Sequence, residues 1–363
     1  MNSKNLVGVA VLAAASVTTA LAPPANAQWS ATTLGPVGAD ESYCFAAGGS
    51  QQVGYALVGG MTRAGLWSRT AASWVDLNPA GSTHSFGFGT DGSRQVGSAR
   101  VGDVFRASLW SGTAASWVDL NPADSVSSLA YAIDGSRQAG YANVGGVTRA
   151  SLWSGTAASW VDLNPVGSTG STAFAASGSQ QTGYADVGGV TRASLWSGTA
   201  GSWVDLNPAG AVSSVAYATS GTRQAGSAQV GGGTSASLWS GTAASWVDLN
   251  PAGATESGAA AISGLQQAGY ALVGGVTRAS LWSGTAASWV DLSAFLLAEF
   301  TITFAKGIST DGVNTYVSGY GFNSVTERVE ALLWTQPVPA PGALGVLAVG
   351  GLMVARRRRT AST

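Results

Sequence analysis

The sequence predicts an all-β fold, a seven-bladed β-propeller of four-stranded blades that an N-terminal strand closes. Three observations lead to this prediction. Near copies of one segment recur every 43 residues from Trp67 to Trp282, and about 40–45 residues is the length of a propeller blade. Each copy holds four short runs suited to β-strands. The first part of the repeat occurs seven times, whereas its last strand occurs only six times.

The first 27 residues have the features of a secretory signal peptide. Lys4 lies in a short polar start, an apolar run extends from Leu6 to Leu21, and Ala25-Asn26-Ala27 has the small-x-small pattern of a cleavage site. We therefore assign residues 1–27 to a signal peptide that signal peptidase cleaves after Ala27, so that the mature chain begins near Gln28.

Within one repeat, four short runs have the composition of β-strands, and glycine-containing turns separate them. These runs are Ser128–Ile133, Arg137–Val144, Thr148–Ser154 and Ser159–Leu163. None of them has the helical spacing of apolar residues, and no linker between them is long enough to hold a helix. The repeat is therefore predicted to form one four-stranded sheet.

The third and fourth strands form a predicted hairpin whose register depends on its loop. A four-residue loop, Gly155–Ala158, places Ser151 opposite Asp162, whereas a two-residue turn would place Arg149 opposite Asp162. Both registers keep the same two faces, because side chains alternate along a strand. One face carries Ala150, Leu152, Val161 and Leu163, and the other carries Arg149, Trp153, Trp160 and Asp162. Each face can pack on a neighbouring copy, and the two tryptophans form a predicted cross-strand pair.

The number of copies predicts how the ring closes. The segment that ends in a Leu-Trp pair occurs seven times, at Trp67, Trp110, Trp153, Trp196, Trp239, Trp282 and Trp334. The last copy ends at Gln336-Pro337 without a fourth strand, and Ala31–Pro36 resembles the missing strand. A strand supplied from the N-terminus would hide the edge that an open array presents. The predicted propeller covers residues 28–336.

The last repeat is longer than the others. Trp282 and Trp334 are 52 residues apart, nine more than the period, and the excess lies around Ser293–Thr303. A longer loop or an extended strand is therefore expected in one blade.

Residues 337–363 have three parts: Val338-Pro339-Ala340-Pro341, an apolar run over residues 342–355, and four arginines, Arg356, Arg357, Arg358 and Arg359. This arrangement resembles the PEP-CTERM sorting signal of Gram-negative bacteria, with Ala340 in place of the consensus glutamate. The resemblance implies transient anchoring in the membrane and processing by an exosortase-type enzyme. A plain C-terminal membrane anchor is the alternative, since the arginines would stay on the cytoplasmic side. Both interpretations place the propeller outside the cytoplasm.

The repeat itself resembles the HAF repeat of bacterial extracellular proteins. The resemblance rests on Arg149-Ala150-Ser151-Leu152-Trp153, on Asp162-Leu163, and on the glycine-bounded strands before them. Arg and Ser replace the His and Phe of that pattern, and Asn-Pro replaces the Gly after Asp-Leu. The resemblance implies an extracellular repeat protein and names no catalytic residue. The Gly-His and Trp-Asp dipeptides that mark WD-repeat propellers are missing.

Composition sets limits on function. Seventeen Lys and Arg residues balance 18 Asp and Glu residues, so charge gives no reason to expect nucleic acid as a partner. Charged residues make up only 10% of the chain, which is typical of an exported β-structure. Cys44 is the only cysteine, so no internal disulfide can form, and we expect it to be a small buried hydrophobe.

One aspartate and, in most copies, one arginine recur in each repeat. These residues are Asp76, Asp119, Asp162, Asp205, Asp248 and Asp291, and Arg63, Arg106, Arg149, Arg192 and Arg278, with Ser235 in place of the sixth arginine. A ring of carboxylates could bind a cation, but we expect each aspartate to bind backbone N–H groups and pair with arginine. We also expect the tryptophans to pack rather than to stack on sugars, and His84 to lie in a surface loop. No catalytic residue, metal site or cofactor is predicted.

The sequence favours an exported, non-enzymatic structural or interaction module at the cell surface or in the extracellular matrix. Near-identical blades repeat the same group around an axis, which suits multivalent contact better than catalysis by different converging groups. A lectin-like propeller that binds exopolysaccharide is the second hypothesis. A glycan-cleaving enzyme is the third, and it requires an acidic pair, whereas the candidates Asp124, Glu256 and Glu299 lie in different repeats.

Overall fold

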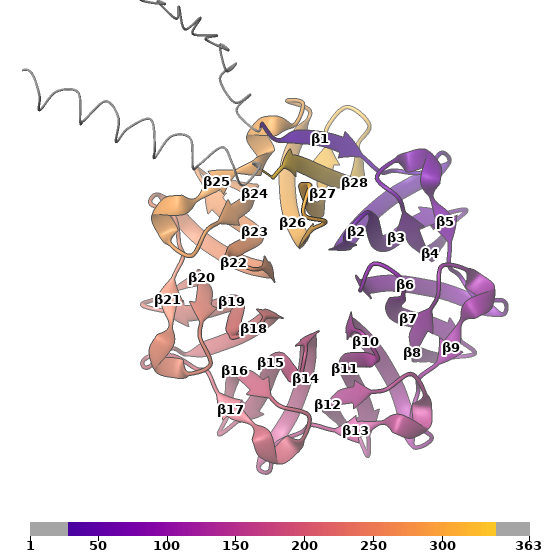
Figure 1. The fold of residues 1–363 in the computed structure, drawn as a ribbon, viewed down its shortest axis with the longest axis vertical. Helices are drawn as coiled ribbons and strands as arrows, with labels where there is room; N and C mark the ends of the chain where they lie inside the picture. The colour runs from indigo at the N-terminus through magenta and orange to yellow at the C-terminus, as the bar shows by residue number, and fades with distance from the viewer. Residues whose placement is uncertain (1–27, 339–363) are drawn as a thin grey trace, which may run out of the picture. The chain divides into compact units, whose positions relative to one another are not determined.

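The computed structural model of the protein describes residues 28–338. In this range seven four-stranded antiparallel sheets stand around a central axis, which confirms the predicted seven-bladed β-propeller (Figure 1). The only helices in residues 28–338 are 3-10 turns of three or four residues. Within that range no helix has the length and apolar character needed to cross a membrane. The predicted signal peptide with its cleavage site at Ala27, and Pro339 to Arg359 of the predicted sorting signal, lie outside the described residues.

The first four blades follow one pattern, from the innermost strand outwards. Blade 1 has β2 (Ala39–Gly48), β3 (Gln51–Val58), β4 (Met61–Trp67) and β5 (Val75–Asp76). Blade 2 has β6 (Ser82–Thr90), β7 (Gln95–Val101), β8 (Val104–Trp110) and β9 (Val118–Asp119). Blade 3 has β10 (Ser125–Asp134), β11 (Arg137–Val144), β12 (Val147–Trp153) and β13 (Val161–Asp162). Blade 4 has β14 (Ser168–Ser177), β15 (Gln180–Val187), β16 (Val190–Trp196) and β17 (Val204–Asp205).

The remaining blades keep this order, except that the last takes its outer strand from the N-terminus. Blade 5 has β18 (Ser213–Ser220), β19 (Arg223–Val230), β20 (Gly233–Trp239) and β21 (Val247–Asp248). Blade 6 has β22 (Ala254–Ser263), β23 (Gln266–Val273), β24 (Val276–Trp282) and β25 (Val290–Asp291). Blade 7 has β26 (Phe300–Thr310), β27 (Asn314–Asn323), β28 (Arg328–Pro337) and β1 (Ser30–Thr33).

The outer hairpin of each blade has the register that a four-residue loop requires. In blade 3, Ser151 pairs with Asp162 and Leu152 with Val161, so the two-residue turn is wrong. The fourth strand is shorter than predicted, because a 3-10 turn forms before it. These turns are η1 (Ala71–Ser73), η2 (Ala114–Ser116), η3 (Ala157–Ser159), η4 (Ala200–Ser202), η5 (Ala243–Ser245) and η6 (Ala286–Ser288). Trp160 ends η3 and lies next to the ladder rather than in it.

Packing between the blades follows the two predicted faces of the hairpin. Trp153 is fully buried against Leu109 and Leu120 of the preceding blade. Leu152, on the other face, packs with Trp196 of the following blade. Seven such clusters occur in the described residues, one at each interface between blades. A buried aromatic side chain removes about 150–250 Å² from water, so each of these tryptophans contributes on the order of 4 kcal/mol.

A hydrogen bond of one type joins every blade to the next. The N–H of Ala150 in β12 donates to Oγ of Ser171 in β14 over 2.9 Å. The equivalent bond at the closing interface runs from the N–H of Ala331 to Oγ of Ser42, also over 2.9 Å. The third strand therefore satisfies a buried backbone donor with a side chain of the neighbouring blade. Because the seventh bond spans nearly the whole chain, it closes the ring.

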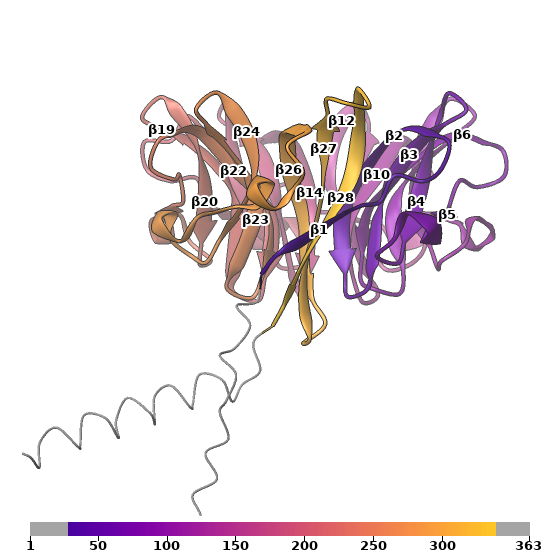
Figure 2. The same cartoon turned by 90° about the horizontal axis from the view of Figure 1, so that it is seen from above.

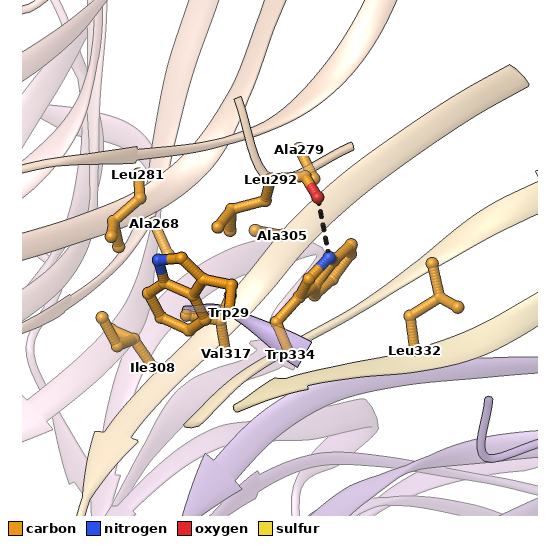
Figure 3. Close-up of a cluster of buried hydrophobic side chains, with 10 residues drawn as sticks. All are labelled: Trp29, Ala268, Ala279, Leu281, Leu292, Ala305, Ile308, Val317, Leu332 and Trp334. Atoms are coloured by element: carbon orange, nitrogen blue, oxygen red, sulfur yellow. Dashed lines mark hydrogen bonds between the residues drawn. The ribbon is translucent and has the colours of Figure 1, made fainter. Parts of the chain in front are cut away.

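The N-terminal strand completes blade 7, as predicted. β1 pairs with β28 from Ser30 opposite Thr335 to Thr33 opposite Leu332 (Figures 1 and 2). Trp29, just before β1, is buried in the cluster between blades 6 and 7 (Figure 3). In the same cluster, Nε1 of Trp334 donates to the carbonyl oxygen of Leu292 over 2.9 Å. The predicted strand Ala31–Pro36 was placed one residue too late at its start.

Blade 7 contains the expected irregularity. The extra residues form a 3-10 turn, η7 (Leu292–Phe295), and lengthen β26 to 11 residues. At the end of the blade the N–H of Val338 donates to the carbonyl oxygen of Val313 over 2.7 Å. Since Ser30 pairs with Thr335, the first and last described residues lie at the same edge of blade 7.

Candidate functional site

The innermost strands bring one equivalent residue from each blade to the propeller axis. These residues are Phe45, Phe88, Tyr131, Phe174, Tyr217, Ala260 and Lys306. In every blade this residue has no partner in the ladder between the first two strands. In blade 3, for example, the pairing passes from Ala130 to Ala132 and leaves out Tyr131. Each is thus the extra residue of a β-bulge, a feature that redirects a side chain and is common beside functional sites.

Five of these residues are aromatic, and their rings form a continuous row that we call the axial arc (Phe45, Phe88, Tyr131, Phe174 and Tyr217). The distances between successive ring centroids are 5.8, 5.2, 5.1 and 5.5 Å. These separations lie within the range of about 4.5–7 Å that aromatic pairs prefer. The arc is therefore held in place by ring contacts that cross four blade interfaces.

The axial arc lines a cavity of about 290 Å³, which we call the axial cavity. Ala260 and Lys306 complete its wall, in the two blades that carry no aromatic residue at this position. A second cavity of about 190 Å³ is lined by the arc except Tyr217, by Ala260 and Lys306, and by residues that follow these positions in the innermost strands. Blades 6 and 7 therefore give the axis one wall that differs from the rest.

Lys306 is the only lysine among residues 28–338. Its Nζ lies 5.3 Å from the ring centroid of Phe304 and 5.8 Å from that of Tyr320, close enough for cation–π attraction. Within the described part of the chain it forms no salt bridge. Burial lowers the pKa of the Lys306 amine, because desolvation penalises the ammonium form.

Two tyrosines add polar groups to the axial arc. Burial raises the pKa of Tyr131, so its hydroxyl group stays protonated and can donate a hydrogen bond. Tyr217 is more open, with 37% of its surface exposed. The axial cavity thus combines aromatic faces, hydroxyl groups and one ammonium group.

Two carboxylates lie further along the innermost strands, each bound to a tyrosine. The hydroxyl group of Tyr43 donates to Glu41 over 3.0 Å, and that of Tyr270 donates to Glu256 over 2.6 Å. Burial, reinforced by these carboxylates, raises the pKa of both tyrosines. Glu256, one of the three candidates for a catalytic acidic pair, therefore forms its hydrogen bond within its own blade.

The seam between blades 7 and 1 contains a separate cavity of about 450 Å³. Asp40, Glu41 and Glu330 line it together with Arg328, whose guanidinium group donates to the carbonyl oxygen of Ala39 over 3.1 Å. Glu330 accepts hydrogen bonds from Asn323 and Thr326. The sequence analysis missed this group, because its members do not recur and lie far apart in the chain.

The repeated aspartates and arginines have the structural roles expected of them. Five Arg–Asp pairs have N–O distances of 2.7–2.8 Å. The second oxygen of Asp162 also accepts the N–H of Asn164 over 2.7 Å. In blade 5, where Ser235 replaces the arginine, Asp248 is exposed. The tryptophans that end the third strands are fully buried, as expected for packing residues.

His84 differs from its prediction. It lies in strand β6 and is partly buried, opposite Arg100 in β7, rather than in a surface loop. The surface-loop assignment was wrong because the innermost strand of blade 2 begins at Ser82, so His84 pairs with β7 and lies on a partly buried face of the sheet. Asp124 and Glu299 lie in blades 3 and 7, so the acidic candidates do not converge. Within residues 28–338 no three His, Cys, Asp or Glu side chains gather as a metal site would require.

The axial arc is the feature that the sequence analysis overlooked. Its aromatic residues recur every 43 residues from Phe45 to Tyr217, the same period as the tryptophans. This column of aromatics was a usable signal. It was missed because nothing in the sequence shows that a bulge turns these residues towards the axis.

No protein-family model and no curated protein matches the sequence. Solved structures do match. The β-propeller domain of the Trilobed protease from Pyrococcus furiosus gives a TM-score of 0.54 at 9% identity, and covers 83% of this chain and 98% of that one. An S511A mutant of puromycin hydrolase gives a TM-score of 0.52 at 12% identity, and the match covers 80% of this chain and 53% of that one. The acylaminoacyl peptidase of Pyrococcus horikoshii gives a TM-score of 0.50 at 10% identity, and the match covers 84% of this chain and 53% of that one.

The fold and the site together define a class, a ring-closed β-propeller with an aromatic axial cavity. The chain spans about half the length of the two full enzymes, 53% in each case. At 9–12% identity, these likenesses show the fold alone. The Pyrococcus furiosus domain is described as having an open velcro topology. In this chain, by contrast, β1 pairs with β28 and the ring is closed.

Proposed function

We propose that the protein is an exported, non-enzymatic interaction module of the cell surface or extracellular matrix, with the axial cavity as its contact site. The observation that carries this proposal is a difference between two sets of repeated positions, the charged residues of the outer hairpins and the residues at the axis. The repeated charged residues are paired within five of the blades, whereas the residues at the axis are not the same in every blade and line an open cavity. A rigid closed ring with such a cavity suits recognition.

The proposal of export rests on the predicted signal peptide and on the resemblance of residues 337–363 to a PEP-CTERM signal. Signal peptidase would cleave after Ala27, and an exosortase-type enzyme would recognise Val338 to Pro341 and the arginine cluster. Intact-mass analysis of surface material tests both steps. We expect a chain that starts at Gln28 and lacks Arg356 to Arg359. Surface material that retains Arg359 would contradict the sorting proposal and favour a plain membrane anchor.

The axial arc favours a second candidate, a lectin-like propeller that binds exopolysaccharide. Aromatic rings offer flat apolar surfaces for the C–H faces of sugar rings, and their burial at an interface contributes most of the affinity in many complexes. A glycan array probed with the purified protein tests this candidate. We expect signals that Tyr131→Ala and Phe174→Ala remove. Silence across a broad array would contradict it.

The enzymatic alternative is open to a direct test. The matching propellers of puromycin hydrolase and acylaminoacyl peptidase belong to chains of which this one spans about half. We expect no turnover in a screen of polysaccharide and peptide substrates. Turnover that Glu41→Gln or Glu330→Gln abolished would assign catalysis to the seam cavity and contradict the non-enzymatic proposal.

A further inference from the structure

The axial cavity lacks the symmetry of the ring around it. Five of the seven bulge residues are aromatic, but Ala260 has a single side-chain carbon and Lys306 carries an ammonium group. Ala260 leaves free space at the position where its counterparts place a ring, and Lys306 supplies the one cationic group beside that space. Such a combination distinguishes a binding site from a channel that is merely filled by side chains.

We propose that the axial cavity binds an acidic sugar, with its carboxylate on the Lys306 ammonium group and its ring against the axial arc. This inference rests on the proposed interaction role and names its ligand class. Lys306 has no carboxylate partner in the described residues, although an ammonium group that is taken out of water gains from one. A bound carboxylate would supply the missing counter-charge.

The size of the cavity limits the ligand to about one ring. At about 290 Å³ it lies at the lower end of the range of about 300–1,000 Å³ that small-molecule sites occupy. A long polymer does not fit, but the acidic end unit of a chain or a free uronic acid does. These two sources share the same chemistry, a carboxylated sugar ring.

The polar groups in the wall favour a sugar over other anions. The hydroxyl groups of Tyr131 and Tyr217 have no hydrogen-bond partner that the structure shows within residues 28–338. They can bind the hydroxyl groups of a sugar, whereas an aromatic acid such as benzoate has only its carboxylate to offer to Lys306 and to both tyrosines. A cationic ligand is disfavoured, since Lys306 already lies against Phe304 and Tyr320 and would repel it.

Reductive methylation with a ¹³C label gives a direct probe of this site. Lys306 is the only lysine of residues 28–363, so in a chain that starts at Gln28 the spectrum of Lys306→Met distinguishes its signal from that of the N-terminal amine. We expect titration with glucuronate or galacturonate to shift the Lys306 signal and to leave that of the N-terminal amine unchanged. Glucose and galactose should bind at least tenfold more weakly. A uronate-terminated oligosaccharide that binds more tightly than the free acid would identify a chain end as the source.

Three variants separate the parts of the proposal. Lys306→Met should remove the preference for acidic over neutral sugars, whereas Lys306→Arg should keep it. Ala260→Phe copies the residue class of five other blades, so it should fold and fill the cavity, and we expect at least a tenfold loss of binding to the acidic sugar. Ser235→Arg, which adds a positive charge to the outer hairpin of blade 5, should bind like the wild type.

Several results would overturn the inference. Equal binding of glucuronate and glucose, an unchanged preference in Lys306→Met, or no binding of any uronate would each do so, and tighter binding of benzoate would reject the sugar class. Capture of exopolysaccharide that survives both Ala260→Phe and Lys306→Met would place the contact elsewhere. In that case the interaction role would stand, but the axial cavity would no longer be its contact site and the axial inference would fail.

Discussion

At the scale of single residues, the copies act as natural variants of one another. In blades 2 to 6 the indole N–H of the tryptophan that follows the 3-10 turn donates to a serine in the third strand, as Trp160 does to Ser151 over 2.8 Å. In blade 1 the serine is replaced by Gly65, and Nε1 of Trp74 is buried without a partner. A buried donor without a partner is costly.

Gly65→Ser should therefore stabilise the protein by about 1 kcal/mol, since it supplies the missing acceptor for Trp74. The new Cβ would lie 2.3 Å from Nε1 of Trp74, so the indole must take the position that it has in the other blades. Urea unfolding measures the change. Gly65→Ala is the matched control, because it adds the same carbon without the oxygen. A Ser variant no more stable than the Ala variant would contradict the assignment.

The missing arginine of blade 5 allows a second comparison. Ser235→Arg should restore the pair with Asp248 and add no more than about 1 kcal/mol, because the five existing pairs are about one-third exposed. The gain should disappear at about 1 M salt, where screening is strong. Ser235→Gln, which has no charge, is the control in urea unfolding. An equal gain from Gln at both salt concentrations would show that packing, not charge, is responsible.

Among the elements, the closing strand β1 is the one strand whose blade partners come from the far end of the described chain. Every other blade is built from consecutive strands, but β1 reaches β28 across 305 residues, as between Ser30 and Thr335. Its four residues have little area of their own to bury, so Trp29 provides the anchor in the cluster between blades 6 and 7. Trp29 and this short ladder therefore hold β1 in blade 7, in addition to the contacts that close the ring between blades 7 and 1.

Trp29→Ala should destabilise the protein by about 3–5 kcal/mol, as large-to-small changes at buried tryptophans do. It should also release β1 and expose the edge of β28, so that limited proteolysis cuts near residue 34. Val166→Ala is the control, because Val166 is fully exposed and its loss should change stability by less than about 0.5 kcal/mol. A Trp29→Ala protein that stayed folded and protease-resistant would show that β1 does not need Trp29 as an anchor.

At the scale of the whole molecule, tyrosines with raised pKa values are distributed around the axis. Burial raises the pKa of Tyr55 to about 12 and raises those of Tyr43, Tyr131 and Tyr270 as well. The folded state then keeps protons that the unfolded state releases above the ordinary tyrosine pKa of about 10. This contribution to stability is complete below about pH 10 and is lost as the pH rises through the folded-state values.

The free energy of unfolding should therefore fall between about pH 10 and 12, and Tyr55→Phe should reduce the fall. Urea unfolding at several pH values measures it. Lys306 acts in the opposite direction, since its lowered pKa makes stability rise as the pH approaches the ordinary lysine value of about 10.4. Lys306→Met should accordingly remove the rise in stability below about pH 10.4. A free energy of unfolding that stayed constant over this pH range would contradict the burial of these tyrosines.

The repeat in the sequence was enough to predict the number of blades, the strands of each blade, the faces of the outer hairpin and the exchange of the closing strand. It could do so because a repeat of 43 residues places Trp153, Asp162 and their copies in the same local environment each time, and local pairing follows from alternation along a strand. The register did not follow in the same way, since the loop allowed two arrangements and the structure shows the one with Ser151 opposite Asp162.

Which side chains lie together at the axis and at the seam could be seen only in the folded ring. A bulge in each innermost strand turns Tyr131 and its counterparts inward, and the ring brings Lys306 and Ala260 into the same wall as Phe45. Closure likewise places Glu41 beside Glu330, at opposite ends of the chain. The physical reason is that these contacts depend on the curvature and closure of the whole ring, which no single repeat contains.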